Sequence, residues 1–249
     1  MVDTFNDYHL IKGWKKDEFA ASGNSSLLDV YGRLIRVYVS GSIPAALDFG
    51  FGNGEMLQAL KNLQVGDIYG IEANTALVEL ANKSGFQAYS SISEIPARLE
   101  GKLSLITAMH VLEHIEYEAL TDLLSKFSKL LRPGGYLIAA FPNGESPFSN
   151  FAFHSDPTHI TLLTREKCRI LALDNPLELV TYKAFPAISG YSRKLHIQLL
   201  SRLRESGEHL IYYVLSKLIY GNENVLMSPV AVAVWKNSTD SMNNYKSAT

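Results

Sequence analysis

The feature that most constrains this chain is an alternation of short apolar runs with longer amphipathic runs, which starts near Ile43. Short apolar runs bounded by turn residues are typical of buried strands, and apolar residues spaced three or four apart are typical of helices. We expect strands at residues 45–49, 68–71, 86–89, 103–109, 136–141, 178–185 and 230–235, and helices at 54–62, 75–83, 117–131 and 164–173. Such an alternation predicts right-handed crossovers and a mostly parallel, doubly wound α/β sheet with helices on both faces.

The 249 residues suit one large domain. We expect an N-terminal helical cap at residues 1–42, the main domain at 43–237 and a flexible tail at 238–249. Residues 190–222 read as a helical insertion before the last strand, because apolar residues recur there at helical spacing. Such an insertion would serve as a lid over an acceptor or as the interface of a homodimer. Its basic residues would suit a phosphate-bearing acceptor or belong to a solvated helix face: Arg193, Lys194, Arg202, Arg204 and Lys217.

Composition removes several classes of protein. The net charge of −2 gives no basic field to hold a nucleic-acid backbone, so we expect no nucleic-acid partner. No apolar run approaches the ~20 residues that a transmembrane helix needs, and residues 1–16 lack the apolar core of a secretory signal. The single cysteine, Cys168, excludes an intrachain disulfide and fits a reducing compartment, so we expect a cytoplasmic protein.

A glycine-rich loop, Asp48-Phe-Gly50-Phe-Gly52-Asn-Gly54, joins the first expected strand to the following helix. Ligands in such sheets bind at the carboxyl ends of the strands, where glycines let the backbone come close. A dinucleotide fingerprint requires G-x-G-x-x-G, whereas here Glu55 takes the place of the final glycine and would repel a pyrophosphate. The loop therefore argues against NAD, although a turn of this kind without a ligand is also conceivable.

Two carboxylates accompany this loop. Glu72 ends the second expected strand, 24 residues after Asp48, where an acid can accept hydrogen bonds from both ribose hydroxyls. A carboxylate at Asp48 suits a ligand that carries an ammonium group. A ligand with a ribose, a cationic amino-acid end and no pyrophosphate is S-adenosylmethionine. The alternative for Glu72 is a solvated acid at a strand end.

The chain resembles the class I S-adenosylmethionine-dependent methyltransferase family in four segments that occur in the right order, residues 47–54, 69–74, 109–115 and 131–138. The resemblance implies a Rossmann-like sheet of seven strands whose last strand is antiparallel. It also implies that Gly50, Gly52 and Gly54 hold the methionine part of the cofactor, Glu72 the ribose, and Met109 and His110 the methyl region. Ser90 and Ser91 stand where the family often has an acid for adenine, and Ser104 where its fourth strand often starts with Asp.

Two histidine clusters are candidates for the base that a hydroxyl acceptor needs. His110 follows the fourth expected strand, and we interpret its neighbours Glu113 and His114 as structural. The second cluster contains Asp156 and His159 and resembles an Asp-x-x-His segment of methyltransferases that modify sugars or glycans. There His159 would be the base and Asp156 would orient it or bind a sugar hydroxyl; alternatively, Asp156 simply starts a turn.

We expect no metal, because the spacing of His154, Asp156 and His159 matches no helix-face metal motif. The predicted function is S-adenosylmethionine-dependent O-methylation of a saccharide or glycan-related acceptor, as in polysaccharide biosynthesis. The alternatives are an aromatic or quinone-type hydroxyl acceptor, and a domain that binds the cofactor without catalysis.

Overall fold

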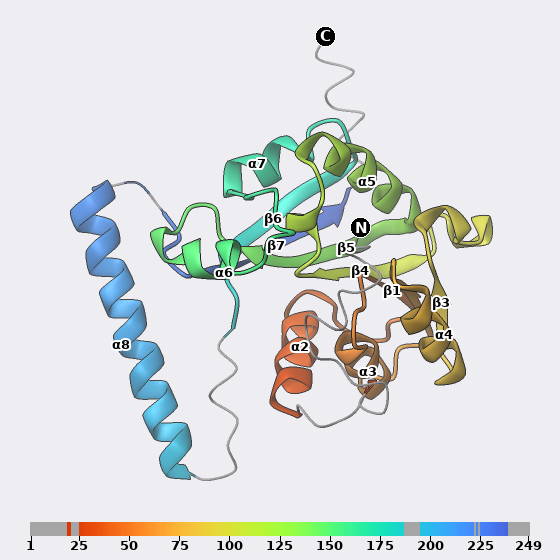
Figure 1. Ribbon diagram of the computed structural model, residues 1–249, viewed down its shortest axis with the longest axis horizontal. Helices are drawn as coiled ribbons and strands as arrows, with labels where there is room; N and C mark the ends of the chain where they lie inside the picture. Colours follow the sequence, from red (N-terminus) through yellow and green to blue (C-terminus); the bar gives the residue numbers. More distant parts are fainter. Residues whose placement is uncertain (1–18, 21–24, 187–194, 222, 224, 239–249) are drawn as a thin grey trace.

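The computed structural model of this chain describes residues 19–20, 25–186, 195–221, 223 and 225–238 (Figure 1). Side chains of helix α8 are described at residues 203, 206–208 and 210–220. Most of the predicted N-terminal cap, the predicted tail and the basic pair Arg193 and Lys194 lie outside the described residues.

A seven-stranded sheet forms the centre of the molecule, with the strand order β3-β2-β1-β4-β5-β7-β6. The strands are β1 (Ala45–Phe49), β2 (Asp67–Ile71), β3 (Gln87–Tyr89), β4 (Leu103–Met109), β5 (Leu131–Pro142), β6 (Leu177–Ala184) and β7 (Val230–Asn237). Strand β7 pairs antiparallel with both of its neighbours, whereas the pairs among β1 to β5 are parallel. The prediction of a doubly wound, mostly parallel sheet with an antiparallel last strand is confirmed.

Helices cover both faces of this sheet (Figure 1). The helices are α2 (Ser25–Tyr38), α3 (Glu55–Asn62), α4 (Thr75–Lys83), α5 (Tyr117–Leu130), α6 (Asn150–His154), α7 (Arg165–Ile170) and α8 (Leu195–Tyr220), with short 3-10 turns η3 (Ile92–Glu94), η4 (Ala97–Leu99), η5 (Leu112–His114) and η6 (Pro147–Ser149). Helices α2 and α3 share one apolar cluster with one face of the strands, and α5 and α7 share another with the opposite face. No helix in the described part of the chain is long and apolar enough to cross a membrane.

The segment Arg132-Pro-Gly-Gly differs from the prediction. We expected it to separate a helix from a strand that starts at Tyr136, but β5 begins at Leu131, directly after α5. The pairing with β4 shifts between Leu103 and Leu105, so that the glycines form an irregularity within the strand. A Cβ on Gly135 would lie 3.0 Å from the carbonyl oxygen of Leu103, which explains why a glycine stands there.

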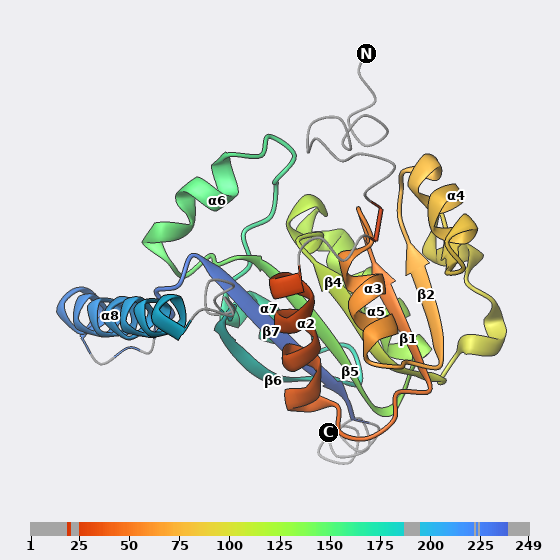
Figure 2. The ribbon, with the colours of Figure 1, turned by 90° about the horizontal axis from the view of Figure 1, so that it is seen from below.

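The helical insertion α8 lies between β6 and β7 in sequence, and it stands apart from the sheet in two perpendicular views (Figures 1 and 2). Its 26 residues make it the longest of the described helices. By contrast, α2 is integrated into the domain, since its buried face packs on α3 and the sheet.

The strand order places β1 between β2 and β4. The connection after β1 leads to β2, towards one edge of the sheet, and the connection after β4 leads to β5, towards the other edge. The two connections therefore diverge at the carboxyl ends of β1 and β4. Such a switch point is where open α/β sheets bind ligands.

Candidate functional site

A cavity of about 590 Å³ opens at this switch point. Its walls come from the loop after β1, the end of β2, the turn after β3, the turn after β4 and the side chains of Leu27 and Tyr31 on α2. The volume lies within the range of about 300–1,000 Å³ that is usual for small-molecule sites. Asp48, Gly50, Gly52, Glu72, Met109 and His110, six residues that the sequence predicted, all line this one cavity.

Three positions of the loop after β1 have a backbone conformation that favours glycine. Gly50, Gly52 and Gly54 have φ angles of 73°, 50° and 82°, in the left-handed region. A Cβ on Gly50 would lie 2.3 Å from a methyl carbon of Val111, so the loop presses against the turn after β4. Gly54 does not line the cavity; it is the N-cap of α3 and lies against Phe19.

Glu72 ties this loop to the end of β2. The backbone N–H of Gly52 donates to Oε2 of Glu72 at 3.0 Å, and the N–H of Asn74 donates to Oε1 at 3.1 Å. A carboxylate has about four acceptor positions. Two of them therefore remain for the hydroxyls of a ribose, which is the role that the family resemblance implies.

Asp48 is a buried acid at the floor of the cavity, with 2% of its surface exposed. Its Oδ1 accepts a hydrogen bond from the Thr107 hydroxyl at 2.7 Å. Burial, which is the largest effect, and the negative charges of Glu72 and Glu55 together raise the pKa of Asp48 to about 7, against the opposing effect of the Thr107 hydrogen bond. A bound cation would offset this cost of ionising the carboxyl.

Charge selects the ligand class. Asp48, Glu55 and Glu72 line the cavity, and none of the described lining residues is a lysine or arginine. Negative walls attract a cation and repel phosphate. The cavity therefore fits the sulfonium and ammonium groups of S-adenosylmethionine and does not fit a pyrophosphate.

The turn after β4 brings His110 and His114 into the cavity wall. His110 has a φ of 57°, a conformation that is unusual for a residue with a side chain. Its backbone N–H donates to the carbonyl oxygen of Ala140 at 2.8 Å, and its Nδ1 lies 3.3 Å from Oε1 of Glu113. The sequence did not predict a site role for His114 or Glu113; their three- and four-residue spacing from His110 on a tight turn is the signal that could have found them.

His159 and Asp156 lie behind this wall and do not line the cavity. The His159 side chain is 8% exposed, and its Nδ1 lies 2.8 Å from the carbonyl oxygen of Phe153. Its ring packs edge-on against the ring of His114, with centroids 4.7 Å apart. Oδ1 of Asp156 accepts hydrogen bonds from the backbone N–H and the hydroxyl of Thr158, as expected for the turn that was the alternative interpretation of this residue. Its Oδ2 lies 3.9 Å from Nε2 of His159.

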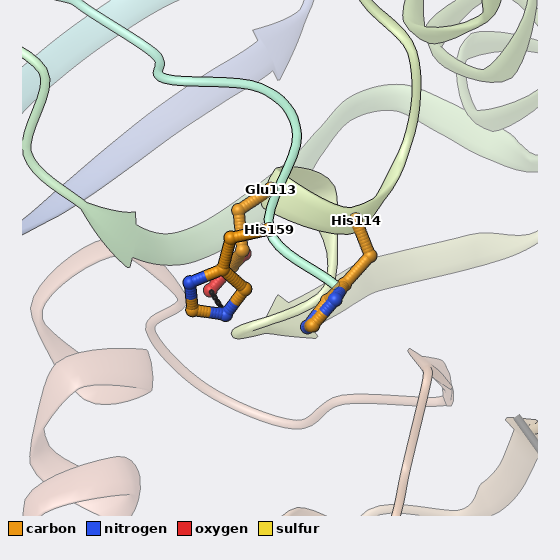
Figure 3. A group of neighbouring side chains, drawn as sticks. All are labelled: Glu113, His114 and His159. Atoms are coloured by element: carbon orange, nitrogen blue, oxygen red, sulfur yellow. Dashed lines mark ion pairs between the residues drawn. The ribbon is translucent and has the colours of Figure 1, made fainter. Parts of the chain in front are cut away.

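The fold thus joins the two histidine clusters that were separate in the sequence. Glu113 connects them, because its Oε1 lies 3.3 Å from Nδ1 of His110 and 3.9 Å from Nε2 of His159. Figure 3 shows the contact with His159. The backbone N–H groups of Ile160 and Thr161 also donate to the carbonyl oxygen of Glu113. His154, the remaining histidine of the second cluster, is exposed on α6.

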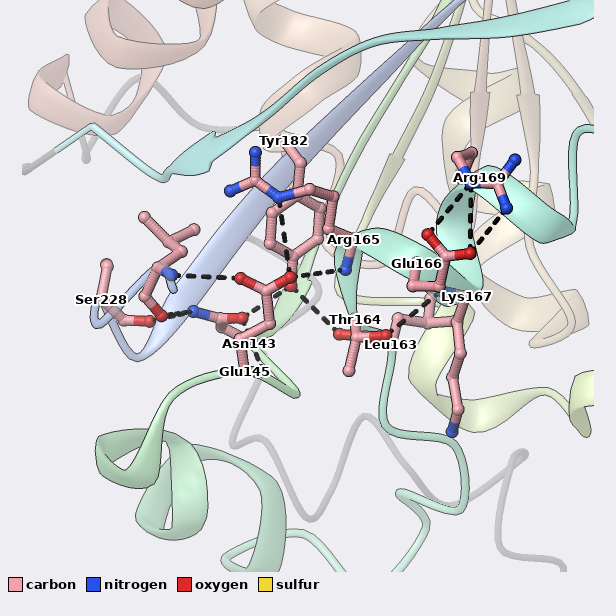
Figure 4. Close-up of polar contacts among 11 residues, drawn as sticks. Asn143, Glu145, Leu163, Thr164, Arg165, Glu166, Lys167, Arg169, Tyr182 and Ser228 are labelled. Atoms are coloured by element: carbon pink, nitrogen blue, oxygen red, sulfur yellow. Dashed lines mark hydrogen bonds and ion pairs between the residues drawn. The ribbon is translucent and has the colours of Figure 1, made fainter. Parts of the chain in front are cut away.

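A buried hydrogen-bond network around Asn143 holds the loops that follow β5 (Figure 4). Nδ2 of Asn143, at the end of β5, donates to the carbonyl oxygens of Leu226 and Ser228 at 2.7 Å each. Its Oδ1 accepts from the Tyr182 hydroxyl at 2.6 Å and from the N–H of Glu145 at 3.0 Å. The network fastens the segment that follows α8 to β5 and β6.

Comparison with known families agrees with this geometry. A family model described as a methyltransferase domain matches residues 40–182. No curated protein sequence matches the chain.

Solved structures show the same fold. A SAM-dependent methyltransferase from Archaeoglobus fulgidus superposes with a TM-score of 0.60 at 19% identity, over 92% of this chain and 99% of that one. A putative methyltransferase from Haloferax volcanii, solved with the Trm112 methyltransferase activator, gives 0.57 at 13% identity over 90% and 98%. Geranyl diphosphate C-methyltransferase from Streptomyces coelicolor A3(2) gives 0.56 at 12% identity over 86% and 81%. At these identities the likeness concerns the fold.

The titration of Asp48 yields a first prediction. Because its carboxyl loses its proton near pH 7, wild-type affinity for S-adenosylmethionine should rise between pH 5.5 and 7.5 relative to that of Asp48→Asn. At pH 7.5 the variant should bind about 10- to 100-fold more weakly, the effect of losing a charged hydrogen bond. Isothermal calorimetry across this pH range measures the ratio, and a ratio that does not change with pH would exclude the proposed role of this carboxylate.

The raised pKa of Asp48 also determines whether the stability of the protein rises or falls with pH. A pKa that rises from 3.8 to about 7 on folding means that the folded protein keeps a proton that the unfolded chain loses. The stability of the cofactor-free protein should therefore fall as the pH rises from about 4 to 7, and Asp48→Asn should lack that contribution. Urea denaturation of both proteins along the pH series provides the check.

The hydrogen-bond network around Asn143 yields a third prediction. Tyr182→Phe removes one donor to Asn143 and should lower the free energy of unfolding by about 1–2 kcal/mol. Tyr117→Phe is the matched control, because its hydroxyl makes only a long contact of 3.5 Å with the Lys167 carbonyl. Urea denaturation measures both; equal losses would show that the buried network contributes nothing specific.

Proposed function

The chain belongs to the class I S-adenosylmethionine-dependent methyltransferase family, and from this premise we propose that it methylates a hydroxyl oxygen of a small, polyhydroxylated acceptor of the saccharide class. The observation that carries the proposal is His110, an imidazole in the cavity wall whose Nδ1 faces the buried carboxylate of Glu113 at 3.3 Å. An aliphatic hydroxyl needs such a base, because it is a weak nucleophile while it holds its proton.

When bound, S-adenosylmethionine supplies an electrophilic methyl carbon on its sulfonium sulfur. The protein has to hold the acceptor oxygen in line with that carbon and to receive the hydroxyl proton. A hydrogen bond from Nδ1–H of His110 to Glu113 makes Nε2 of His110 the basic atom, and the nearby carboxylate stabilises the imidazolium that forms. His110 is the base in this proposal.

Asp156 and His159 have a different proposed role, because the described structure gives them no place in the cavity wall. His159 packs on His114, which does line the cavity, and it lies beside Glu113. We therefore assign Asp156 and His159 as positioning residues. The saccharide as acceptor rests on the resemblance of their Asp-x-x-His segment to that of sugar-modifying methyltransferases.

His110→Ala should lower kcat/KM by at least 100-fold and leave affinity for S-adenosylmethionine within about threefold. His154→Ala is the control, since this histidine is exposed on α6. The assay follows methyl transfer from labelled cofactor to free sugars, nucleotide-linked sugars and catechols, with a mass gain of about 14 Da where a methyl replaces a proton.

Three outcomes would contradict the proposal. Full turnover by His110→Ala would remove its base. Turnover of catechols alone would favour the aromatic class, and saturable cofactor binding without product from any acceptor would favour a non-catalytic binder. The proposal includes a cytoplasmic location, with which the free, buried thiol of Cys168 is compatible.

We also propose that a second copy of this chain covers helix α8. The face that α8 turns towards the domain carries Ser216, which is buried, and the half-buried Tyr212, whose ring packs on Phe148. The opposite face is apolar and exposed by 44–77%, through Leu203, Leu210, Ile211, Val214 and Leu218. This distribution is the reverse of that of a solvated surface helix.

The spacing of the apolar residues on this face allows two copies of α8 to pair with each other. A twofold axis between Leu210 and Ile211 in an antiparallel helix pair places these two residues opposite each other and Leu203 opposite Leu218, so the contact is isologous. With 26 residues the helix is about 39 Å long, which gives room for the roughly 1,000 Å² that a specific interface buries.

Val214→Glu should therefore convert a dimer to a monomer in sedimentation analysis at micromolar concentration. Leu173→Glu is the control, since this leucine is also exposed, by 58%, but lies near α7. A wild-type protein that sediments as a monomer would exclude the proposed interface.

A further inference from the structure

Glu113, His114 and His159 form a compact cluster between the cavity wall and the loop that precedes α7 (Figure 3). One donor atom from each side chain lies within 4.8 Å of the other two. Glu113 is 1% exposed, and the His159 side chain is 8% exposed. Sequence spacing alone gave no reason to expect a metal, because Glu113 and His159 are 46 residues apart and only the fold brings them together.

The carboxylate of Glu113 is incompletely satisfied. The contacts of this carboxylate with His110 and His159 both go to Oε1. Oε2 is buried and has no hydrogen-bond partner among the described residues. A buried carboxylate oxygen in this condition is costly unless a cation or a donor completes its shell.

The hydrogen bonds around His159 fix which nitrogen carries the proton. Nδ1–H donates to the carbonyl oxygen of Phe153 at 2.8 Å, which places the lone pair on Nε2. Nε2 then lies 3.9 Å from Oε1 of Glu113 and 3.9 Å from Oδ2 of Asp156. In this tautomer, Nε2 of His159 and Oε1 of Glu113 both offer a lone pair, and a cation between them would bind to both.

A hydrogen bond also fixes which ring nitrogen of His114 carries the proton. The Thr158 hydroxyl donates to Asp156 at 2.6 Å, so it accepts from Nδ1–H of His114 at 2.8 Å. This bond places the unprotonated nitrogen of His114 at Nε2. Histidines that bind metals usually donate their other N–H to a carbonyl or a polar side chain in this manner.

We propose that Glu113, His114 and His159 bind one divalent transition-metal ion. Two imidazole nitrogens and one carboxylate oxygen make a donor set that suits Zn²⁺ and its neighbours better than Mg²⁺ or Ca²⁺, which prefer oxygen ligands. The ligands are held in advance, since the N–H groups of Ile160 and Thr161 fasten the His159 loop to the carbonyl of Glu113.

Three protein ligands leave coordination positions for a small molecule. His114 is also part of the cavity wall, so an ion at this cluster lies next to the space where the acceptor would bind. There it would polarise an acceptor hydroxyl. This catalytic role rests on the proposed function, whereas the binding of the ion does not.

The test uses tag-free, full-length protein that has been treated with a chelator and dialysed. Isothermal calorimetry with Zn²⁺, Mn²⁺ and Mg²⁺ should show one Zn²⁺ per chain and Mg²⁺ affinity at least 100-fold lower. Co²⁺ should give the visible absorption of a nitrogen-ligated ion. His159→Ala and Glu113→Gln should each lose at least 100-fold in Zn²⁺ affinity, whereas His154→Ala should bind as the wild type does.

Correct folding of the variants is checked by circular dichroism and by calorimetric binding of S-adenosylhomocysteine. A second readout is thermal unfolding, in which Zn²⁺ should raise the midpoint of the wild type and leave that of His159→Ala unchanged. Wild-type protein that binds no Zn²⁺ or Co²⁺, or that binds as tightly after His159→Ala, would overturn the site. Zn²⁺ binding without methyl transfer to any hydroxyl would instead refute the proposed function and leave the metal site standing.

Discussion

The close contact between the loop after β1 and the turn after β4 is the constraint on which the rest of the site depends. A Cβ on Gly50 would lie 2.3 Å from Val111, so no larger residue fits between them. The contact is possible because β1 and β4 are adjacent, parallel strands whose carboxyl ends emerge at one edge. It brings the acids after β1 and β2 and the histidines after β4 into the lining of a single cavity.

Electrostatics then decides what the cavity accepts. Glycine loops at the start of a helix often bind phosphate, but here Asp48, Glu55 and Glu72 line the cavity. Burial and mutual repulsion keep Asp48 near the point of protonation, with a pKa of about 7. The carboxyl of Asp48 therefore resists ionisation until a cation arrives. A glycine loop at the position where other α/β folds bind dinucleotides serves a sulfonium nucleoside in this family.

The sequence predicted most of the sheet because local signals coincide with burial in this fold. Buried parallel strands such as Leu103–Met109 appear as apolar runs, and the Asn74 cap places the start of α4 at Thr75, as predicted. The predicted start of β5 was wrong, because Pro133 and the two glycines that follow it are typical of a turn. In the fold these residues lie next to β4 and form an irregularity within the strand.

The histidine clusters mark the limit of sequence reasoning. His110 was predicted from its place after a strand, but the link from Glu113 to His159 depends on how the loop after β5 folds back, which no local spacing encodes. The spacing of the apolar residues of α8 predicted a helix, but the sequence could not show that these residues face away from the domain.

The central claim is that the cavity at the ends of β1, β2 and β4 holds the cofactor between the acids and the histidines. A crystal structure with S-adenosylhomocysteine tests it most directly. The account predicts the ribose hydroxyls on Glu72, the amino group beside Asp48 and the sulfur directed towards His110. Ligand density at another place, or adenosine hydroxyls that do not contact Glu72, would contradict it.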